Sequence, residues 1–226
     1  MIHLINYTGN IGCGKTTRLN EVIESYGLHD HAESLEKESN QLFILDDKIL
    51  GFVFEPVDNN PFLLNFYMDK KRYGFLMEIF IIEYFNIRLS QLLDQYKLLN
   101  TEKDLYIYTD YGMPIVFINH LKSKDLLDDI RHRYLVDIYQ LLNFEFIINN
   151  FDKIKIKYID TSPEECLNNI NKRNRGCEVE VSLELLNELD SMYKKSNNML
   201  DAYIKKDKKN FKKIKFSEVE YIKESQ

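Results

Sequence analysis

The feature that most constrains this chain is a glycine-rich segment near its start, GNIGCGKT at residues 9–16, which fits the pattern G-x-x-x-x-G-K-[ST]. Residues 2–8 before it predict a short buried strand, and residues 15–26 after it predict a helix that ends at Gly27. In such a strand, loop and helix, backbone N–H groups converge on an anion, and the positive end of the helix dipole lies behind them. The segment therefore predicts a phosphate-binding loop.

The loop also predicts its ligand. Lys15 is placed to bridge the β- and γ-phosphates of a nucleoside triphosphate, and the hydroxyl of Thr16 is placed to hold Mg²⁺. We therefore expect ATP and Mg²⁺ as cofactors. The residues expected to contact the nucleotide are Gly9, Asn10, Ile11, Gly12, Cys13, Gly14, Lys15, Thr16 and Thr17.

The rest of the chain alternates β-prone and helical segments. Apolar, β-prone runs fall within 42–54, 104–110, 153–160 and 212–216, and helical patterns fall at 71–99, 126–146, 163–175 and 182–204. Residues 28–41 are polar and show no periodicity. Strands that alternate with helices are typical of a parallel sheet covered on both faces. With no repeat and no linker, the 226 residues predict a single domain.

Composition limits the partners and the location of the chain. Thirty basic and 36 acidic residues give a net charge of -6, which argues against electrostatic binding to nucleic acid or to an anionic membrane. No uncharged apolar run approaches the ~18 residues that a membrane span needs. Three cysteines without a CxxC pair indicate a reducing compartment. With no leader pattern at the start, we expect a cytoplasmic protein.

Three blocks of the sequence resemble the deoxyribonucleoside kinase family, which includes the deoxycytidine and deoxyguanosine kinases. They are GNIGCGKTT at 9–17, FEPVDNNPFLLNFYMDKKRYGFLMEIF at 54–80 and YIDTSPEECLNNINKRNR at 158–175. The resemblance implies a P-loop nucleoside-kinase-like α/β fold, with a five-stranded parallel sheet, helices on both faces and an arginine lid at about 172–181. It implies ATP-dependent 5′-phosphorylation of a deoxyribonucleoside, a homodimer formed through the long helices, and the host cytoplasm as location if the source is viral.

Two acids at strand ends are candidates for the chemistry. Glu55, in Glu55-Pro56-Val57, follows a β-prone run and is placed to accept the proton of a sugar hydroxyl, the general-base role that the resemblance implies. An acid that caps the following turn is the simpler alternative. Asp110 ends the run at 104–110 and is the expected partner of Thr16 at Mg²⁺, close to the substrate.

The lid residues come from the third block. Arg173 and Arg175 offer planar guanidinium groups that suit the γ-phosphate, although a solvated basic helix end would have the same composition. The resemblance pairs Glu178 with Tyr67 at the 3′-hydroxyl of the sugar.

Three departures from the family bear on activity and base preference. Tyr111 replaces an expected arginine in a chain with only 7 Arg, Asn60 stands near an expected tryptophan, and Glu78 replaces a glutamine that reads the base. An ionised Glu78 would only accept hydrogen bonds, which suits guanine, unless it is protonated in an apolar pocket. A surface position for Glu78 is the alternative. Met77 and Tyr73, on the same helix, are the expected pocket walls, or else belong to the core.

Two other functions stay open. A nucleoside monophosphate kinase of the thymidylate kinase type shares the loop and lid, but it needs a clamp for the acceptor phosphate, usually an arginine. A nucleotide-binding protein without turnover is favoured by Tyr111, because a phosphate-binding arginine can be worth ~10³ to 10⁵ in rate.

Overall fold

The computed structural model describes residues 1–31, 35, 41–57, 59–206 and 216–223. Within these residues the strands form one six-stranded sheet in the order β2-β3-β4-β1-β5-β6. The strands are β1 (Ile2–Thr8), β2 (Leu42–Ile44), β3 (Lys48–Val53), β4 (Asp104–Thr109), β5 (Lys153–Asp160) and β6 (Phe216–Lys223). All neighbouring strands pair in parallel except β2, which forms an antiparallel hairpin with β3. The predicted five-stranded parallel sheet is thus confirmed, with a short sixth strand at its edge.

Alternation along each strand divides the core between the two faces of the sheet. In β1, Leu4 joins one apolar cluster while Ile5 joins the other, and in β3 Ile49 and Leu50 are divided in the same way. Successive side chains of a strand point to opposite faces, so strands that are apolar throughout require cover on both faces.

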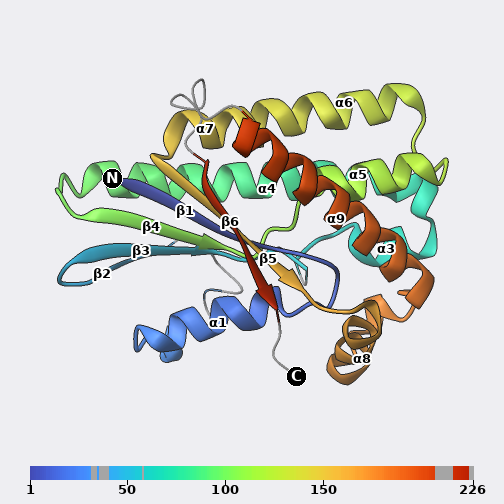
Figure 1. Ribbon diagram of the computed structural model, residues 1–226, viewed down its shortest axis with the longest axis horizontal. Helices are drawn as coiled ribbons and strands as arrows, with labels where there is room; N and C mark the ends of the chain where they lie inside the picture. The colour runs from blue at the N-terminus through green and yellow to red at the C-terminus, as the bar shows by residue number, and fades with distance from the viewer. Residues whose placement is uncertain (32–34, 36–40, 58, 207–215, 224–226) are drawn as a thin grey trace.

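Helices supply that cover (Figure 1). One face packs against α4 (Lys70–Leu98), α5 (Pro114–Ser123), α6 (Asp129–Tyr139) and α7 (Phe146–Asn150), and the other packs against α1 (Lys15–Ser25) and α8 (Pro163–Arg173). α9 (Leu183–Lys206) contacts both α5 and α8. The remaining short elements are α3 (Leu63–Met68), the 3-10 turns at His29–His31 and Gly176–Glu178, and a π-helical segment at Gln140–Glu145 between α6 and α7.

Several predicted boundaries were wrong. The last strand, expected at 212–216, runs from Phe216 to Lys223, and residues 212–215 lie outside the described part of the chain. The helices α3 and α5 were not predicted, because each is short and lies between stronger patterns. The helix expected at 126–146 is three consecutive helical segments that span 129–150. In the part of the chain that the structure describes, no helix has the length and apolar character needed to cross a membrane.

Candidate active site

The predicted catalytic residues meet at the carboxyl edge of the parallel strands. The phosphate loop follows β1, Glu55 follows β3 and Asp110 follows β4, and these three strands are neighbours in the sheet. Asp110 connects the other two elements: its Oδ1 accepts from the backbone N–H of Glu55 at 2.6 Å and its Oδ2 accepts from the hydroxyl of Thr16 at 2.7 Å. This edge of a parallel sheet is where such folds bind ligands.

The phosphate loop has the conformation that its glycines permit. Gly9, Gly12 and Gly14 all have positive φ, of 148°, 77° and 95°. A Cβ atom on Gly12 would lie 2.5 Å from the carbonyl oxygen of Cys166, so α8 approaches the loop too closely for any side chain there. Gly14 is the N-cap of α1, and the N-terminus of this helix receives no side-chain cap from the described residues, so its first N–H groups can bind an anion.

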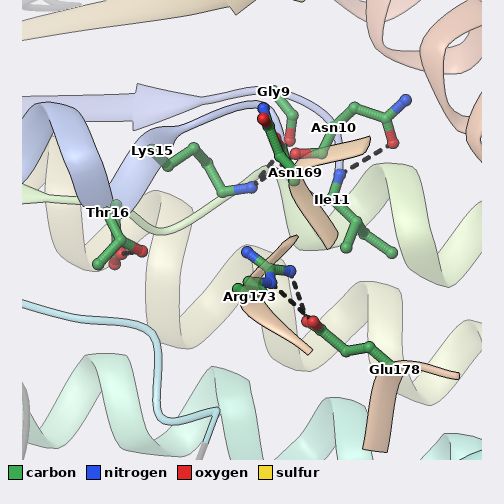
Figure 2. A network of polar contacts seen from close by, with 10 residues as sticks. Gly9, Asn10, Ile11, Lys15, Thr16, Asn169, Arg173 and Glu178 are labelled. Carbon is green, nitrogen blue, oxygen red and sulfur yellow. Dashed lines mark hydrogen bonds and ion pairs between the residues drawn. The ribbon is translucent and has the colours of Figure 1, made fainter. Parts of the chain in front are cut away.

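Two asparagines fix this loop from behind (Figure 2). Asn10 Nδ2 donates to the carbonyl of Leu186 at 2.7 Å, its Oδ1 accepts from the N–H of Ile11 at 2.9 Å, and Asn169 Nδ2 donates to the carbonyl of Gly12 at 3.0 Å. The side chains of Asn10 and Cys13 are fully buried and do not line the cavity described below. Their predicted contact with the nucleotide is therefore limited to the backbone.

Lys15 bends back over the loop. Its Nζ donates to the carbonyl of Asn10 at 2.9 Å and to that of Gly9 at 3.2 Å. Phosphate oxygens in the loop would compete with these two carbonyl oxygens for the ammonium group. Burial disfavours its charge, but Cys13, Tyr193, Glu55 and Asp110 outweigh burial and raise the pKa of Lys15. Lys15 is therefore a fixed cation at the mouth of the loop.

One cavity of about 170 Å³ joins the loop to most of the predicted substrate residues. Its walls include these predicted residues: Gly9, Ile11, Gly12, Gly14, Lys15, Thr16, Thr17, Glu55, Asn60, Tyr67, Met77, Glu78, Tyr111, Arg173, Arg175 and Glu178. Asp110 lies behind this wall, in contact with Thr16. Tyr73 is also absent from the wall, because its ring lies one turn earlier on α4, 5.3 Å from the guanidinium of Arg72.

The acids at the strand ends have shifted pKa values. Burial raises the pKa of Glu55, and Lys15, Arg173 and Arg175 partly offset that effect. Burial also raises the pKa of Asp110, against the hydrogen bonds that its carboxylate accepts from Thr16 and from the backbone of Glu55. The cation of Lys15 thus opposes the effect of burial and favours the ionised form of both acids.

The donors at Thr16 and Asp110 fit Mg²⁺. A hydroxyl oxygen and a carboxylate oxygen lie 2.7 Å apart, and both are the hard oxygen ligands that this ion prefers. Among the described residues, no group of three or more His, Cys, Asp or Glu side chains could hold a metal ion by itself. One or two protein ligands are what Mg²⁺ uses when it is bound together with substrate phosphates.

Glu78 is buried, which removes the surface alternative. Its side chain is 2 % exposed and lines the cavity from α4 beside Met77. Burial, followed by repulsion from Glu55, raises its pKa well above the usual value. This environment favours the neutral form of the carboxyl group over the ionised acceptor that would suit guanine.

Tyr111 replaces the expected arginine with an aromatic wall. Its ring stacks on Phe85 with centroids 3.5 Å apart, it is 7 % exposed, and it lines the cavity. At this position the chain therefore supplies packing in place of a cation.

Arg173 is paired with Glu178 (Figure 2). Its Nε and its terminal Nη2 donate to the two carboxylate oxygens at 2.7 and 2.5 Å, a bidentate pair between the end of α8 and the following 3-10 turn. This ion pair could not be predicted, because residue spacing does not show which way the chain turns after Asn174, which has a φ of 49°. Phe66 and Phe117 also line the cavity and were not foreseen, since they lie on the unpredicted helices α3 and α5.

Comparison with known proteins found related sequences. A sequence profile described as deoxynucleoside kinase matches residues 5–225. A deoxyadenosine kinase of Dictyostelium discoideum is 32 % identical over 88 % of this chain and 69 % of its own length. A deoxyguanosine kinase of the same organism is 30 % identical over 65 % of this chain and 50 % of its own length.

Solved structures show the same fold. A deoxyadenosine kinase from M. mycoides with bound dATP superposes with a TM-score of 0.60 at 23 % identity, over 96 % of this chain and 89 % of that one. The structure of that kinase with bound dCTP gives a TM-score of 0.62 at 19 % identity, over 96 % and 88 %. The profile match over nearly the whole chain establishes that this protein belongs to the deoxynucleoside kinase family.

Proposed function

We propose that this kinase transfers the γ-phosphoryl group of ATP, bound with Mg²⁺, to the 5′-hydroxyl of a deoxyribonucleoside, giving a deoxynucleoside monophosphate and ADP. The observation that carries the proposal is that the phosphate loop and Glu55 line the same cavity. A donor phosphate on the loop and an acceptor hydroxyl at Glu55 would be neighbours there, and such positioning is the larger part of phosphoryl-transfer catalysis.

Glu55 is the general base of this proposal. Burial raises its pKa, which makes the carboxylate a stronger base, while Lys15 and the two arginines favour its ionised form. The hydrogen bond from the backbone of Glu55 to Asp110 fixes the segment that carries it. Glu55 would accept the proton of the 5′-hydroxyl as that oxygen attacks phosphorus.

Lys15, Arg173 and Arg175 would stabilise the negative charge on the transferred group. Thr16 and Asp110 would hold Mg²⁺, which when bound neutralises charge on the phosphate oxygens. Lys15 would exchange its two backbone carbonyl partners for phosphate oxygens, and Arg173 and Arg175 line the same cavity. The two lid arginines take over the task of the arginine that Tyr111 replaces.

The 3′-hydroxyl of the sugar would bind to Glu178 and Tyr67, which both line the cavity. Glu178 is 6 % exposed and already holds Arg173, so the sugar and the phosphate-binding arginine meet at one carboxylate. A nucleoside that occupies Glu178 would loosen this pair and release the guanidinium toward the phosphate. The segment at about 172–181 would act as the lid in this way.

Deoxyadenosine is the acceptor that we favour, because two of the relatives above are deoxyadenosine kinases, and one is bound to dATP. We also propose that the protein acts as a homodimer in the cytoplasm, where nucleosides are salvaged for DNA precursors.

The test is ADP release with ATP and Mg²⁺, first with each of the four deoxynucleosides and then with each monophosphate. We expect turnover with nucleosides, and a loss of about 10² to 10⁴ in kcat for Glu55→Gln. Glu24→Gln, an exposed change on α1, is the matched control and should retain full activity.

The alternatives give different results in the same assay. Turnover only with monophosphates would identify a monophosphate kinase. Binding of ATP without product from any acceptor would identify a binding protein and contradict the proposal.

A further inference from the structure

A second cavity lies beside the candidate active site. It has a volume of about 270 Å³ and is bordered by β1, β5, the segment 111–115 after β4, the π-helical segment and α9. It shares residues 111–114 with the active-site cavity. Its described lining residues include no part of the phosphate loop or the lid, and neither Glu55 nor Glu78. It is therefore a separate space that has Tyr111 as a common wall with the active site.

The lining of the second cavity is largely apolar and carries no charge. Leu4, Ile154 and Ile156 line it from the sheet, and Phe144 and Ile147 line it from the helical layer. Among the described lining residues there is no Asp, Glu, Lys, Arg or His. A charged ligand would lose its hydration here without gaining a counter-ion. The cavity therefore favours an uncharged molecule over a nucleotide.

Two buried polar groups in this lining lack a partner. Asn143 is 1 % exposed and its Nδ2 donates to the carbonyl of Ile82 at 3.4 Å, but its Oδ1 accepts no hydrogen bond from the described part of the chain. The buried hydroxyl of Tyr111 is likewise unpaired among the described residues. A buried acceptor without a donor is costly, and a ligand that supplies the donor recovers that cost.

The backbone that carries Asn143 is itself unusual. Asn143 lies in the π-helical segment between α6 and α7, and its Nδ2 ties this segment to α4. A π-helical turn is rare in proteins and is frequently found at a functional site. In this chain the turn contributes an amide with an open acceptor to the lining of an uncharged cavity.

We propose that this cavity is a second binding site, for an uncharged, mainly apolar molecule that carries a hydrogen-bond donor. The N–H or O–H of this ligand donates to Oδ1 of Asn143, and its apolar part contacts the strand residues Leu4, Ile154 and Ile156. An apolar cavity of ~150 Å³ holds benzene, so a volume of about 270 Å³ has room for a ligand with two fused rings. The site does not depend on the proposed phosphoryl transfer.

Indole and indene test this site, because the two molecules have nearly the same shape and only indole carries an N–H donor. The chain has no tryptophan, so the fluorescence of indole reports its binding, and indene is measured by its displacement of indole. Both probes are titrated into native protein and Asn143→Leu. Indole is also titrated into Ser196→Phe, in which an added ring occupies the cavity, and into native protein that holds deoxyadenosine. Ser191→Phe, at an exposed position of the same helix, is the matched control.

We expect native protein to bind indole more tightly than indene by up to ~10-fold, the scale of one hydrogen bond. Asn143→Leu should bind the two probes with equal affinity, because the acceptor is gone. Ser196→Phe should lose indole binding, and Ser191→Phe should keep it. Deoxyadenosine should not displace indole. Circular dichroism verifies that each variant is folded.

Three results with native protein would overturn the inference: no saturable binding of indole, equal affinities for indole and indene, or displacement of indole by deoxyadenosine. Unchanged indole binding in a folded Ser196→Phe would overturn it as well, because the probe would then lie elsewhere. A preference for indole that persists in Asn143→Leu would do the same for the assigned acceptor. Absence of ADP release would contradict the proposed function alone, since the indole and indene titrations do not require turnover.

Discussion

At the scale of single residues, the carboxyl of Glu78 is the group whose ionisation folding opposes most plainly. Its folded pKa lies well above the usual value, because burial and the charge of Glu55 both disfavour the carboxylate. In the unfolded chain the same group ionises near its ordinary pKa of about 4.3. Below that pH both states are protonated and the contribution of Glu78 to folding is intact. As pH rises toward the folded pKa, the unfolded state alone releases its proton and gains stability.

Replacing Glu78 by Gln should therefore stabilise the fold in a pH-dependent way. At about pH 3 the two proteins should unfold with similar free energies, because Glu78 is largely neutral in both states there. At neutral pH the variant should be more stable by about 1 to 3 kcal/mol, the scale of a buried polar group that lacks its partner. Urea unfolding monitored by circular dichroism measures this difference. A variant that is less stable at neutral pH would show that Glu78 has a counter-ion.

Burial also explains which residues the sequence could not place. Glu55 and Asp110 were predicted because a strand end fixes the position of the residue that follows it. Glu78 lies inside the 29 residues of α4, where a single sequence leaves the rotation of the helix undetermined. Tyr73 was predicted as a wall from the same helical spacing, yet it lies outside the cavity, because the cavity spans little more than one turn of α4.

At the scale of elements, α8 links the phosphate loop to the lid. Its start is fixed by a capping box in which Ser162 and Glu165 each accept from the other's backbone N–H, with Pro163 in the first turn. Asn169 on this helix holds Gly12, and Arg173 at its last turn holds Glu178. Both ends of the cavity are therefore attached to one helix whose boundaries the sequence predicted well.

Removing the guanidinium at the end of α8 should slow phosphoryl transfer. Arg173→Ala should lower kcat by about 10² to 10³, because a charge that acts on the transferred group is lost. The KM for the nucleoside should change less, since Glu178 stays in place. Steady-state kinetics with saturating ATP measures both values. Lys172→Ala removes an adjacent exposed cation and should leave kcat within about twofold, as surface changes generally do. Equal losses in the two variants would reduce Arg173 to a general electrostatic role.

At the scale of the whole molecule, the parallel arrangement of the strands was the most predictable property. A phosphate loop after the first strand, together with alternating strands and helices, leaves few other arrangements. The edges were less predictable, since β2 is only three residues long and β6 begins where the predicted strand ends. Edge strands gain less from neighbours, so their boundaries depend on packing that a pattern does not record.

The remaining question at this scale is assembly, and the outer surface of the helical layer supports the expected homodimer. Ile130 and Tyr134 are 83 % and 52 % exposed on one face of α6, and Leu141 in the π-helical segment is 63 % exposed. On α4, Ile87 is 53 % exposed. Exposed apolar groups of this size on adjacent helices are typical of a surface that another copy covers.

We expect light scattering after size exclusion to give twice the chain mass of 27.0 kDa. Ile130→Asp combined with Tyr134→Asp should yield a monomer, because two buried charges would face each other across a symmetric interface. Ile44→Asp, at an exposed position of the edge strand β2, adds a charge elsewhere and should stay dimeric. Circular dichroism of each variant verifies folding. A native protein of single-chain mass would contradict the dimer. A folded double variant that stays dimeric would show that the contact lies elsewhere, because the added charges act only where the two copies meet.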